Sequence, residues 1–275
     1  MTDASAGAPV TTAQPAVMRN NAAVAIHPTA HGFETAAGDY ERARPDYPDE
    51  AGRWLAERLD LRRGRTVVDI AAGTGKLTRV LAATGADVVA VEPVGGMRAR
   101  LAAALPDVEL LDGVAEAIPL GDASVDATTV GQAFHWFDGD RALTEIHRIT
   151  RAGGRLAIVY NRRPLEHPLQ GALDAILSPL RGQTPAYPDG RWRDAFTRTQ
   201  LWAPVEETEL LHAQLLDREG VVARAASTSF VADLADDRRA EVLDQVRALV
   251  KDHPEPIELP YVCELFLWRR LASTP

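Results

Sequence analysis

A turn of small residues lies between two apolar runs, and a carboxylate stands near the end of each run. Asp69 lies in the first run, Ala71, Gly73 and Gly75 form the turn, and Glu92 directly follows the second run. Small residues in such a turn let a ligand touch the backbone. A carboxylate about 20 residues later can accept hydrogen bonds from ribose hydroxyls. This spacing predicts a βαβ unit that binds a nucleoside.

The chain around the turn alternates strand and helix patterns. Short β-branched runs are followed by apolar residues at helical spacing, which is typical of parallel strands joined by crossover helices. Right-handed crossovers place helices on both faces of the sheet. We expect a Rossmann-like, doubly wound, mostly parallel sheet, with strands over 66–70, 86–91, 108–111, 125–130 and 155–160 and helices over 49–59, 75–84, 97–105 and 141–149.

The later part of the chain departs from this alternation. Prolines interrupt residues 162–204 around an apolar helix, which predicts a lid insertion. Two late strands are expected over 206–215 and 260–269, separated by helices over 218–227 and 238–251. We predict one domain over 31–275 with an N-terminal cap over 31–60, preceded by a disordered tail over 1–30.

Polar residues fall where the predicted parallel strands end. Open α/β sheets bind ligands in the crevice beyond the carboxyl ends of their strands. Residues from four different strands should therefore meet at one edge of the sheet: Asp69, Glu92, Asp112 and Gln132.

The turn departs from the dinucleotide-binding fingerprint, because the third glycine is missing in residues 76–78 that follow Gly75. With Asp69 before it, the turn resembles the D-x-G-x-G-x-G motif of class I S-adenosylmethionine-dependent methyltransferases, with Ala71 in place of the first glycine. The resemblance implies a seven-stranded sheet whose last strand is antiparallel.

Three further segments resemble this family in the same order. Residues 40–48 look like the Y-x-x-x-R-P-x-Y-P segment that folds over the cofactor in small-molecule members. Residues 108–120 are similar to the G-D-A-E-x-L-P-F stretch that contacts adenine. Residues 132–138 resemble the A-x-H-W-F-D motif of a subgroup that includes trans-aconitate methyltransferase-like enzymes. The resemblance runs from about Phe33 to the C-terminus.

The resemblance implies a cofactor, S-adenosylmethionine, and roles for individual residues. Gly73 and Gly75 would let the backbone approach its amino-acid part, Glu92 would bind the ribose, and Asp112 would hold the adenine amine. Met97 would lie against the adenine face or belong to the core. The other residues implied at the cofactor are Tyr40, Arg44, Asp69, Ala71, Val114 and Gln132.

Methyl transfer from a sulfonium depends mainly on alignment, and it needs a base only if the acceptor must lose a proton. His135 is the candidate base, since it follows the fourth strand and imidazole has an ordinary pKa of about 6.5. Its alternative role is to shape the pocket wall. Tyr47, with Tyr40, is expected to position the substrate over the donor methyl group.

Aromatic residues favour a small aromatic or apolar acceptor, as enzymes of specialised metabolism use. The residues expected to contact it are Trp136, Tyr160, Tyr187 and Trp192, although those of the insertion could instead anchor it to the sheet. A second hypothesis is a carboxylate acceptor of the trans-aconitate type. Four arginines could clamp such an acceptor: Arg162, Arg163, Arg191 and Arg193.

Composition limits the remaining possibilities. The 275-residue chain has a net charge of −9 and no basic run, which argues against a nucleic-acid partner. Cys263 is the single cysteine, so intrachain disulfides and multi-thiolate zinc sites are excluded. The sequence shows neither a membrane-spanning stretch nor a secretory signal, and we expect a cytoplasmic protein. The sequence makes no prediction of oligomeric state.

Two other classes of function stay open. A nicotinamide-dependent oxidoreductase would use a similar turn, but the missing third glycine opposes it. A non-catalytic binding protein, or a methyltransferase fold recruited for another reaction, is favoured only by Ala71, whose methyl group narrows the turn.

Overall fold

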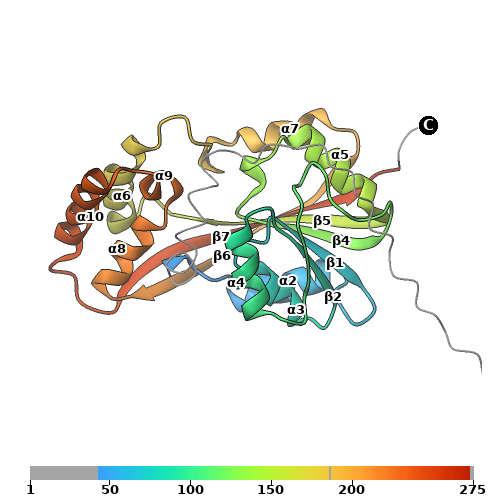
Figure 1. The fold of residues 1–275 in the computed structure, drawn as a ribbon, viewed down its shortest axis with the longest axis horizontal. Helices are drawn as coiled ribbons and strands as arrows, with labels where there is room; N and C mark the ends of the chain where they lie inside the picture. Colours follow the sequence, from blue (N-terminus) through green and yellow to red (C-terminus); the bar gives the residue numbers. More distant parts are fainter. Residues whose placement is uncertain (1–42, 186, 273–275) are drawn as a thin grey trace, which may run out of the picture.

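The computed structural model describes residues 43–185 and 187–272, which form a seven-stranded sheet flanked by helices (Figure 1). The strand order is β3-β2-β1-β4-β5-β7-β6, and β7 runs in the direction opposite to the other six strands. The doubly wound, mostly parallel sheet with an antiparallel last strand is confirmed. The strands are β1 Thr66–Ile70, β2 Asp87–Val91, β3 Glu109–Leu111, β4 Val125–Gly131, β5 Thr150–Arg162, β6 Trp202–Leu216 and β7 Ile257–Arg270.

The helices follow the predicted order. They are α2 Asp49–Arg58, α3 Lys76–Ala82, α4 Gly95–Ala104, α5 Gly139–Ile149, α6 Pro168–Leu177, α7 Asp194–Arg198, α8 Arg218–Ala226, α9 Ser229–Ala232 and α10 Asp236–Val250. Short 3-10 turns add η2 Phe134–Trp136, η3 Ser178–Leu180, η4 Tyr187–Asp189 and η5 Arg191–Arg193. The sequence did not predict α7 and α9, because segments of five and four residues carry little periodicity.

Strand β5 is longer than the sequence indicated. Gly153 and Gly154 predict a turn before the strand, whereas the strand begins at Thr150. A register shift between Val125 and Ala127 of β4 accommodates the extra residues, so that Thr150 pairs with Val125 and Arg155 pairs with Ala127. Glycines inside a strand often mark such an irregularity.

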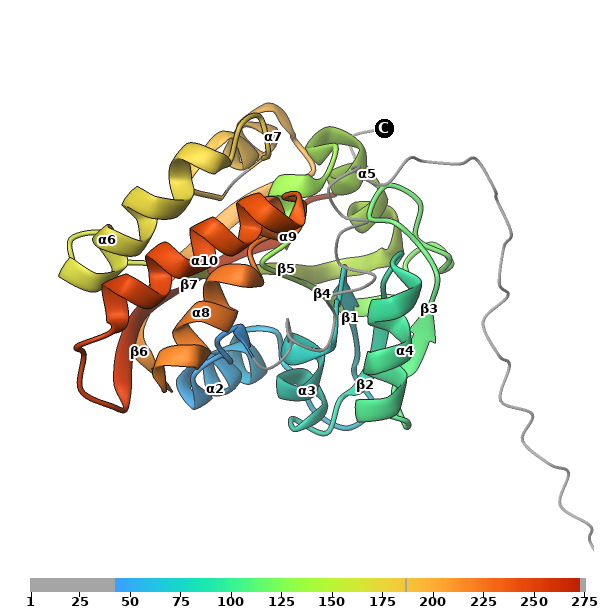
Figure 2. The same ribbon diagram turned by 60° about the vertical axis from the view of Figure 1, so that its left-hand side comes forward.

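Successive side chains along the strands point to opposite faces of the sheet and pack into two separate cores, one on each face. Val68 of β1 packs with α5 and the aromatic residues near α7, whereas its neighbour Val67 packs with α2 and α3. Figure 2 shows α5 and α7 on one side of the sheet and α2 and α3 on the other. Burial on both faces explains the nearly continuous apolar runs of these strands.

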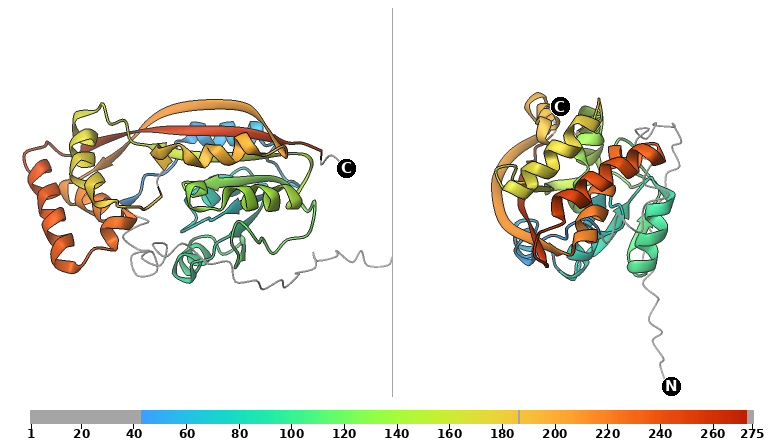
Figure 3. Two further views of the ribbon diagram at one scale, coloured as in Figure 1. Left: turned by 90° about the horizontal axis from the view of Figure 1, so that it is seen from above. Right: turned by 90° about the vertical axis from the view of Figure 1, so that its left-hand side faces the viewer.

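A third core lies at one end of the molecule, where α6, α8, α9 and α10 gather beside the start of β7 (Figures 1 and 3). The predicted insertion over 162–204 divides between two cores. Leu169 and Leu173 of α6 join this helical cluster, whereas Trp192 and Ala195 pack against the main sheet. The predicted tail over 1–30 and residues 31–42 of the cap lie outside the described residues.

Candidate functional site

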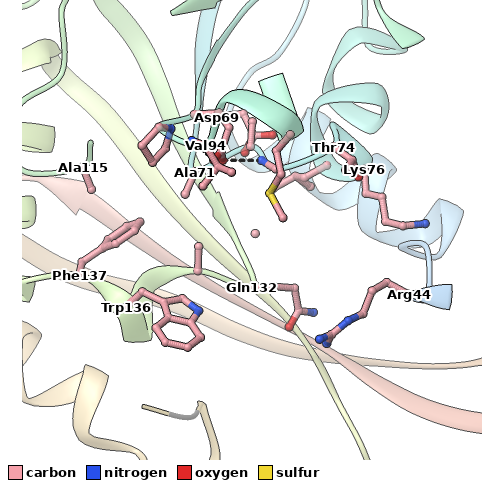
Figure 4. A pocket seen from close by; sticks show the side chains of 18 of the residues that line it. Arg44, Asp69, Ala71, Thr74, Lys76, Val94, Ala115, Gln132, Trp136 and Phe137 are labelled. Atoms are coloured by element: carbon pink, nitrogen blue, oxygen red, sulfur yellow. Dashed lines mark hydrogen bonds between the residues drawn. The ribbon is translucent and has the colours of Figure 1, made fainter. Parts of the chain in front are cut away.

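A cavity opens at the carboxyl ends of β1, β2 and β4, as expected for an open α/β sheet (Figure 4). It receives side chains from the glycine turn, the start of α4, the loop after β4 and the segment before α2. Of the predicted site residues, ten line this cavity: Arg44, Tyr47, Asp69, Ala71, Gly73, Glu92, Met97, Val114, Gln132 and Trp136.

The turn after β1 is held in a left-handed backbone conformation. Ala71, Gly73 and Gly75 have φ angles of 54°, 59° and 91°. The Ala72 amide donates to the Val91 carbonyl at 3.1 Å, which ties the turn to β2. Gly75 does not line the cavity. It faces α4, where a Cβ on this residue would lie 3.0 Å from Leu101. Its lack of a side chain therefore permits close packing between helix and turn.

Ala71 is strained by this geometry, since a left-handed backbone costs an L-residue about 1–2 kcal/mol. Ala71→Gly should raise the free energy of unfolding by about 0.5–1 kcal/mol, because the greater entropy of unfolded glycine offsets part of the gain. Urea unfolding would measure this difference. A less stable variant would show that the turn tolerates alanine without strain.

The Glu92 side chain connects the turn to the start of α4. One carboxylate oxygen accepts from the Gly73 amide at 2.8 Å, and the other accepts from the Val94 amide at 2.8 Å. The side chain is 3% exposed, and burial raises its pKa although both amides lower it. A carboxylate has about four lone-pair positions, so two remain for ligand hydroxyls.

Asp69 lies fully buried at the end of β1, between two threonines. The hydroxyl of Thr78 donates to one of its oxygens at 2.7 Å, and that of Thr129 donates to the other at 3.2 Å. Burial raises the pKa of Asp69 from 3.8 to about 7, against the lowering effect of these hydrogen bonds, and the charge of Glu92 raises it further. Its ionised form is therefore costly at this buried position.

Asp69→Asn should stabilise the unliganded protein at high pH. The unfolded chain releases the Asp69 proton near pH 3.9, whereas the folded protein holds it to about pH 7. The stability due to this proton is therefore complete below about pH 4 and is lost as the pH rises to about 7. At about pH 8, urea unfolding should give the variant a free energy of unfolding about 4 kcal/mol above that of the wild type, and near pH 4 this difference should vanish. An advantage independent of pH would contradict this assignment.

Only some of the residues predicted to contact adenine line the cavity. Met97 and Val114 line the cavity, and a Cβ on Gly73 would lie 3.7 Å from the Met97 sulfur. Asp112 does not line it. Its side chain is 71% exposed and forms a two-point ion pair with Arg98, at 3.0 and 2.9 Å. Arg98 also donates to the Glu92 and Pro93 carbonyls, so it holds Asp112 outside the cavity.

The segment before α2 forms one wall of the cavity. Arg44 donates to the Ser227 carbonyl at 2.7 Å, and its guanidinium points toward Gln132 (Figure 4). The Tyr47 hydroxyl lies 2.7 Å from where a Cβ on Gly131 would stand, at the end of β4. Tyr40 lies outside the described residues.

The loop after β4 sends neighbouring residues in different directions. Gln132, with a φ of 58°, and Trp136 line the cavity, whereas His135 does not. The Tyr160 hydroxyl lies 3.1 Å from the His135 amide nitrogen and 3.2 Å from Nδ1. Because the amide donates to this hydroxyl, the hydroxyl is placed to donate to Nδ1. Burial and then the positive charge of Arg44 hold the His135 pKa well below its ordinary value.

Three of the predicted substrate contacts lie in an aromatic cluster away from the lining. Tyr160 stacks on Tyr187 with ring centroids 3.8 Å apart, and Trp192 packs 5.5 Å from Tyr160. Tyr187 donates a hydrogen bond to Glu264 of β7. Tyr160 and Trp192 are buried in the main core, so these rings attach the segment before α7 to the sheet.

The four arginines considered for a carboxylate clamp are each paired with a carboxylate of the protein. Their partners are Glu264 and Glu209 for Arg162, Asp174 for Arg163, Asp189 for Arg191 and Glu207 for Arg193. None of the four lines the cavity.

Several lining residues were not predicted. Lys76 ion-pairs with Asp46 at 2.6 Å, and Phe137 follows Trp136 in the loop after β4. Both residues directly follow a residue of a recognised motif, Gly75 and Trp136, and this proximity could have identified them. Arg224 had no such signal, since it follows the turn by about 150 residues. The remaining unpredicted lining residues are Pro45, Ala72, Thr74, Leu77, Pro93, Val94, Ala115, Glu116, Gly131, Ala133 and Asn161.

Within residues 43–185 and 187–272, no helix combines the length and apolar composition needed to cross a membrane. The same ranges contain no group of three or more His, Cys, Asp or Glu side chains that could hold a metal ion.

The seven-stranded sheet with an antiparallel last strand is the Rossmann-like fold of methyltransferases. A methyltransferase domain model matches residues 68–158. An uncharacterized methyltransferase of Mycobacterium bovis is 39% identical over 235 residues, covering 84% of this chain and 92% of that protein. One from Schizosaccharomyces pombe is 32% identical, covering 72% and 91%. The chain belongs to the class I S-adenosylmethionine-dependent methyltransferases.

Solved structures support the fold. A protein from Anaeromyxobacter dehalogenans described as a type II methyltransferase superposes with a TM-score of 0.59 at 24% identity, covering 82% of this chain and 97% of its own. The [4+2]-cyclase SpnF has a TM-score of 0.50 at 17% identity, covering 84% and 85%. These similarities show the fold alone, because one fold hosts different reactions.

Proposed function

We propose that this enzyme transfers a methyl group from S-adenosylmethionine to a small aromatic or apolar metabolite, as in specialised metabolism. The observation that carries the proposal is one continuous cavity. It joins the Glu92 carboxylate and the bare backbone at Gly73 to a wall formed by Trp136 and Phe137. The first pair suits a nucleoside donor, and the second suits a flat acceptor.

In this proposal, the cofactor is held by groups that the structure leaves facing the cavity. The remaining lone pairs of Glu92 accept from the ribose hydroxyls, and Met97 and Val114 lie beside the adenine. Ala71 and Gly73 let the amino-acid part approach the backbone, while Arg44 and Gln132 lie where they can bind its carboxylate. Ionised Asp69 would balance the positive charge of the donor.

The reaction needs alignment more than acid–base chemistry. When bound, the donor would supply its sulfonium methyl group. The acceptor atom would bond to the methyl carbon as the carbon–sulfur bond breaks, the sulfur would keep that electron pair and lose its positive charge, and a proton on the acceptor would pass to the solvent. Trp136, Phe137 and Tyr47 would orient the acceptor and exclude water. Asp112 is not assigned to adenine here, because Arg98 already engages both of its oxygens.

We assign His135 a structural role behind the cavity lining, where its Nδ1 contacts the Tyr160 hydroxyl. His135→Gln should therefore lower turnover less than tenfold, whereas losing a general base costs about 10²–10⁴-fold. The wild-type rate should show no ionisation near pH 6.5 from this imidazole, whose pKa is lowered by burial and by Arg44. A hundredfold loss of turnover, with the fold retained, would restore His135 as the base.

The proposed activity can be tested by following radiolabelled methyl groups from S-adenosylmethionine into a panel of phenols, indoles and aliphatic alcohols. Transfer to an aromatic member that is absent without enzyme supports the proposal. Transfer to the aliphatic alcohols alone would exclude aromatic acceptors and leave only apolar ones. Bound cofactor without transfer to any member would favour a binding protein or another reaction.

The carboxylate-clamp hypothesis loses the four arginines first considered for it, because each is ion-paired elsewhere. The oxidoreductase alternative also gains nothing, since buried Thr78 occupies the position of the third glycine and bonds to Asp69.

A further inference from the structure

Arg224 enters the cavity from a helix that belongs to a different core. Its helix, α8, is anchored by Val221, Val222 and Ala225 within the terminal helical cluster. Arg224 extends from this anchored helix to line the same cavity as Glu92. The terminal cluster therefore contributes a charged group to the proposed methyl-transfer site.

The Arg224 side chain is oriented by a buried tyrosine. Its Nε donates to the Tyr261 hydroxyl at 2.9 Å, and its guanidinium carbon lies 5.9 Å from the centre of that ring. Tyr261 is 1% exposed on β7. Because only Nε is engaged in this bond, the two terminal amino groups retain donors for a ligand.

Arg224 forms no ion pair with a carboxylate among residues 43–185 and 187–272, unlike nearby Arg163, which pairs with Asp174 at 2.7 Å. Two further arginines lie near it. Burial and then the charge of Arg224 lower the pKa of Arg163, and Arg44 bonds to the Ser227 carbonyl just beyond α8. An anion in this part of the cavity would offset the repulsion.

Two aromatic residues line the side of the cavity opposite Arg44. Figure 4 shows Trp136 and Phe137 on one side and Arg44 on the other. A ligand that contacts both sides needs a flat apolar part and a charged end. Arginine binds planar carboxylates through two parallel hydrogen bonds, which suits the amino groups of Arg224.

We propose that the methyl acceptor is an aromatic or apolar carboxylic acid, whose carboxylate binds Arg224 while its apolar part packs on Trp136 and Phe137. This inference rests on the proposed function and adds the charge of the acceptor to it. The carboxylate is an anchor in this assignment, and the methylated atom lies on the apolar part. Arg224 is therefore a specificity-determining residue.

The test compares acids with their uncharged amides on the complex with S-adenosylhomocysteine. Calorimetry would use indole-3-acetate, 4-hydroxyphenylacetate and 4-hydroxybenzoate as probes, each beside its amide. At least one acid should bind about tenfold tighter than its amide, and Arg224→Gln should abolish that difference. Arg224→Lys should retain part of it. Arg218→Gln is the matched control, since Arg218 is exposed on the same helix.

The affinity for S-adenosylhomocysteine distinguishes a wrong acceptor assignment from a wrong proposed function. This affinity should be unchanged in Arg224→Gln. A wild-type protein that does not bind S-adenosylhomocysteine would overturn the proposed function itself. Cofactor binding with no acid preferred over its amide would overturn the acceptor assignment alone. The acceptor assignment is also overturned if Arg224→Gln preserves the preference for the acid, because another residue would then bind the carboxylate.

Discussion

Glu92→Ala is expected to weaken binding of S-adenosylhomocysteine about a hundredfold or more. Hydrogen bonds from hydroxyls to a buried carboxylate contribute about 1.5–3 kcal/mol each, and ribose offers two hydroxyls. The substitution also leaves the Gly73 and Val94 amides without their acceptor, so the turn itself is weakened. The variant should therefore be less stable as well, by about 2–4 kcal/mol.

Asp126→Ala separates the loss of stability from the loss of binding. Asp126 is also buried and accepts from a backbone amide, that of Thr66 at 2.8 Å, but it lies at the opposite ends of the strands. Calorimetry should find cofactor affinity near the wild-type value in Asp126→Ala and strongly reduced in Glu92→Ala. Equal losses in the two variants would assign the Glu92 effect to folding alone.

Gly73→Ala should reduce cofactor affinity about tenfold or more, because its methyl group would occupy the face of the turn that approaches the ligand. A left-handed φ of 59° adds strain of about 1–2 kcal/mol. Calorimetric titration with S-adenosylhomocysteine gives the affinity, and urea unfolding gives the strain.

Gly85→Ala is the matched control for Gly73→Ala. Gly85 has a left-handed φ of 79°, has room for a Cβ, and does not line the cavity. Both variants should lose similar stability, and only Gly73→Ala should lose affinity. A comparable loss of affinity in both would mean that strain acts through the whole fold.

The central sheet could be predicted because its signals are local. Runs such as Val88 to Val91 are apolar on both faces, and the glycine turn after Ile70 fixes where β1 ends. Spacing then placed Glu92 at the end of β2, in the cavity with Gly73. The ends of β5 could not be predicted, since its start at Thr150 depends on pairing with Val125 of a different strand.

Site residues on loops were harder to place, because their direction depends on distant partners. Asp112 stands at a predicted strand end, but Arg98 of the preceding helix draws it into an exposed ion pair. His135 stands in a recognisable motif, but the Tyr160 hydroxyl engages it away from the cavity lining. Neither partner is indicated by residues near the motif.

Arg224 illustrates the same limit at greater range. Its sequence neighbours Val221, Val222 and Ala225 form an apolar helix stripe, which indicates packing and gives no direction for the arginine. The contact with Tyr261 of β7 directs it to the cavity. Long-range packing, rather than local pattern, therefore places this charged residue in the cavity lining.

The most direct test of the account is calorimetric titration of the purified protein with S-adenosylhomocysteine, beside a parallel titration with NADH. Micromolar binding of S-adenosylhomocysteine, lost in Glu92→Ala and absent for NADH, is the result that this structure predicts. Binding of NADH in its place, or S-adenosylhomocysteine binding that is unaffected by loss of Glu92, would contradict the assignment of the cavity as a methyl-donor site.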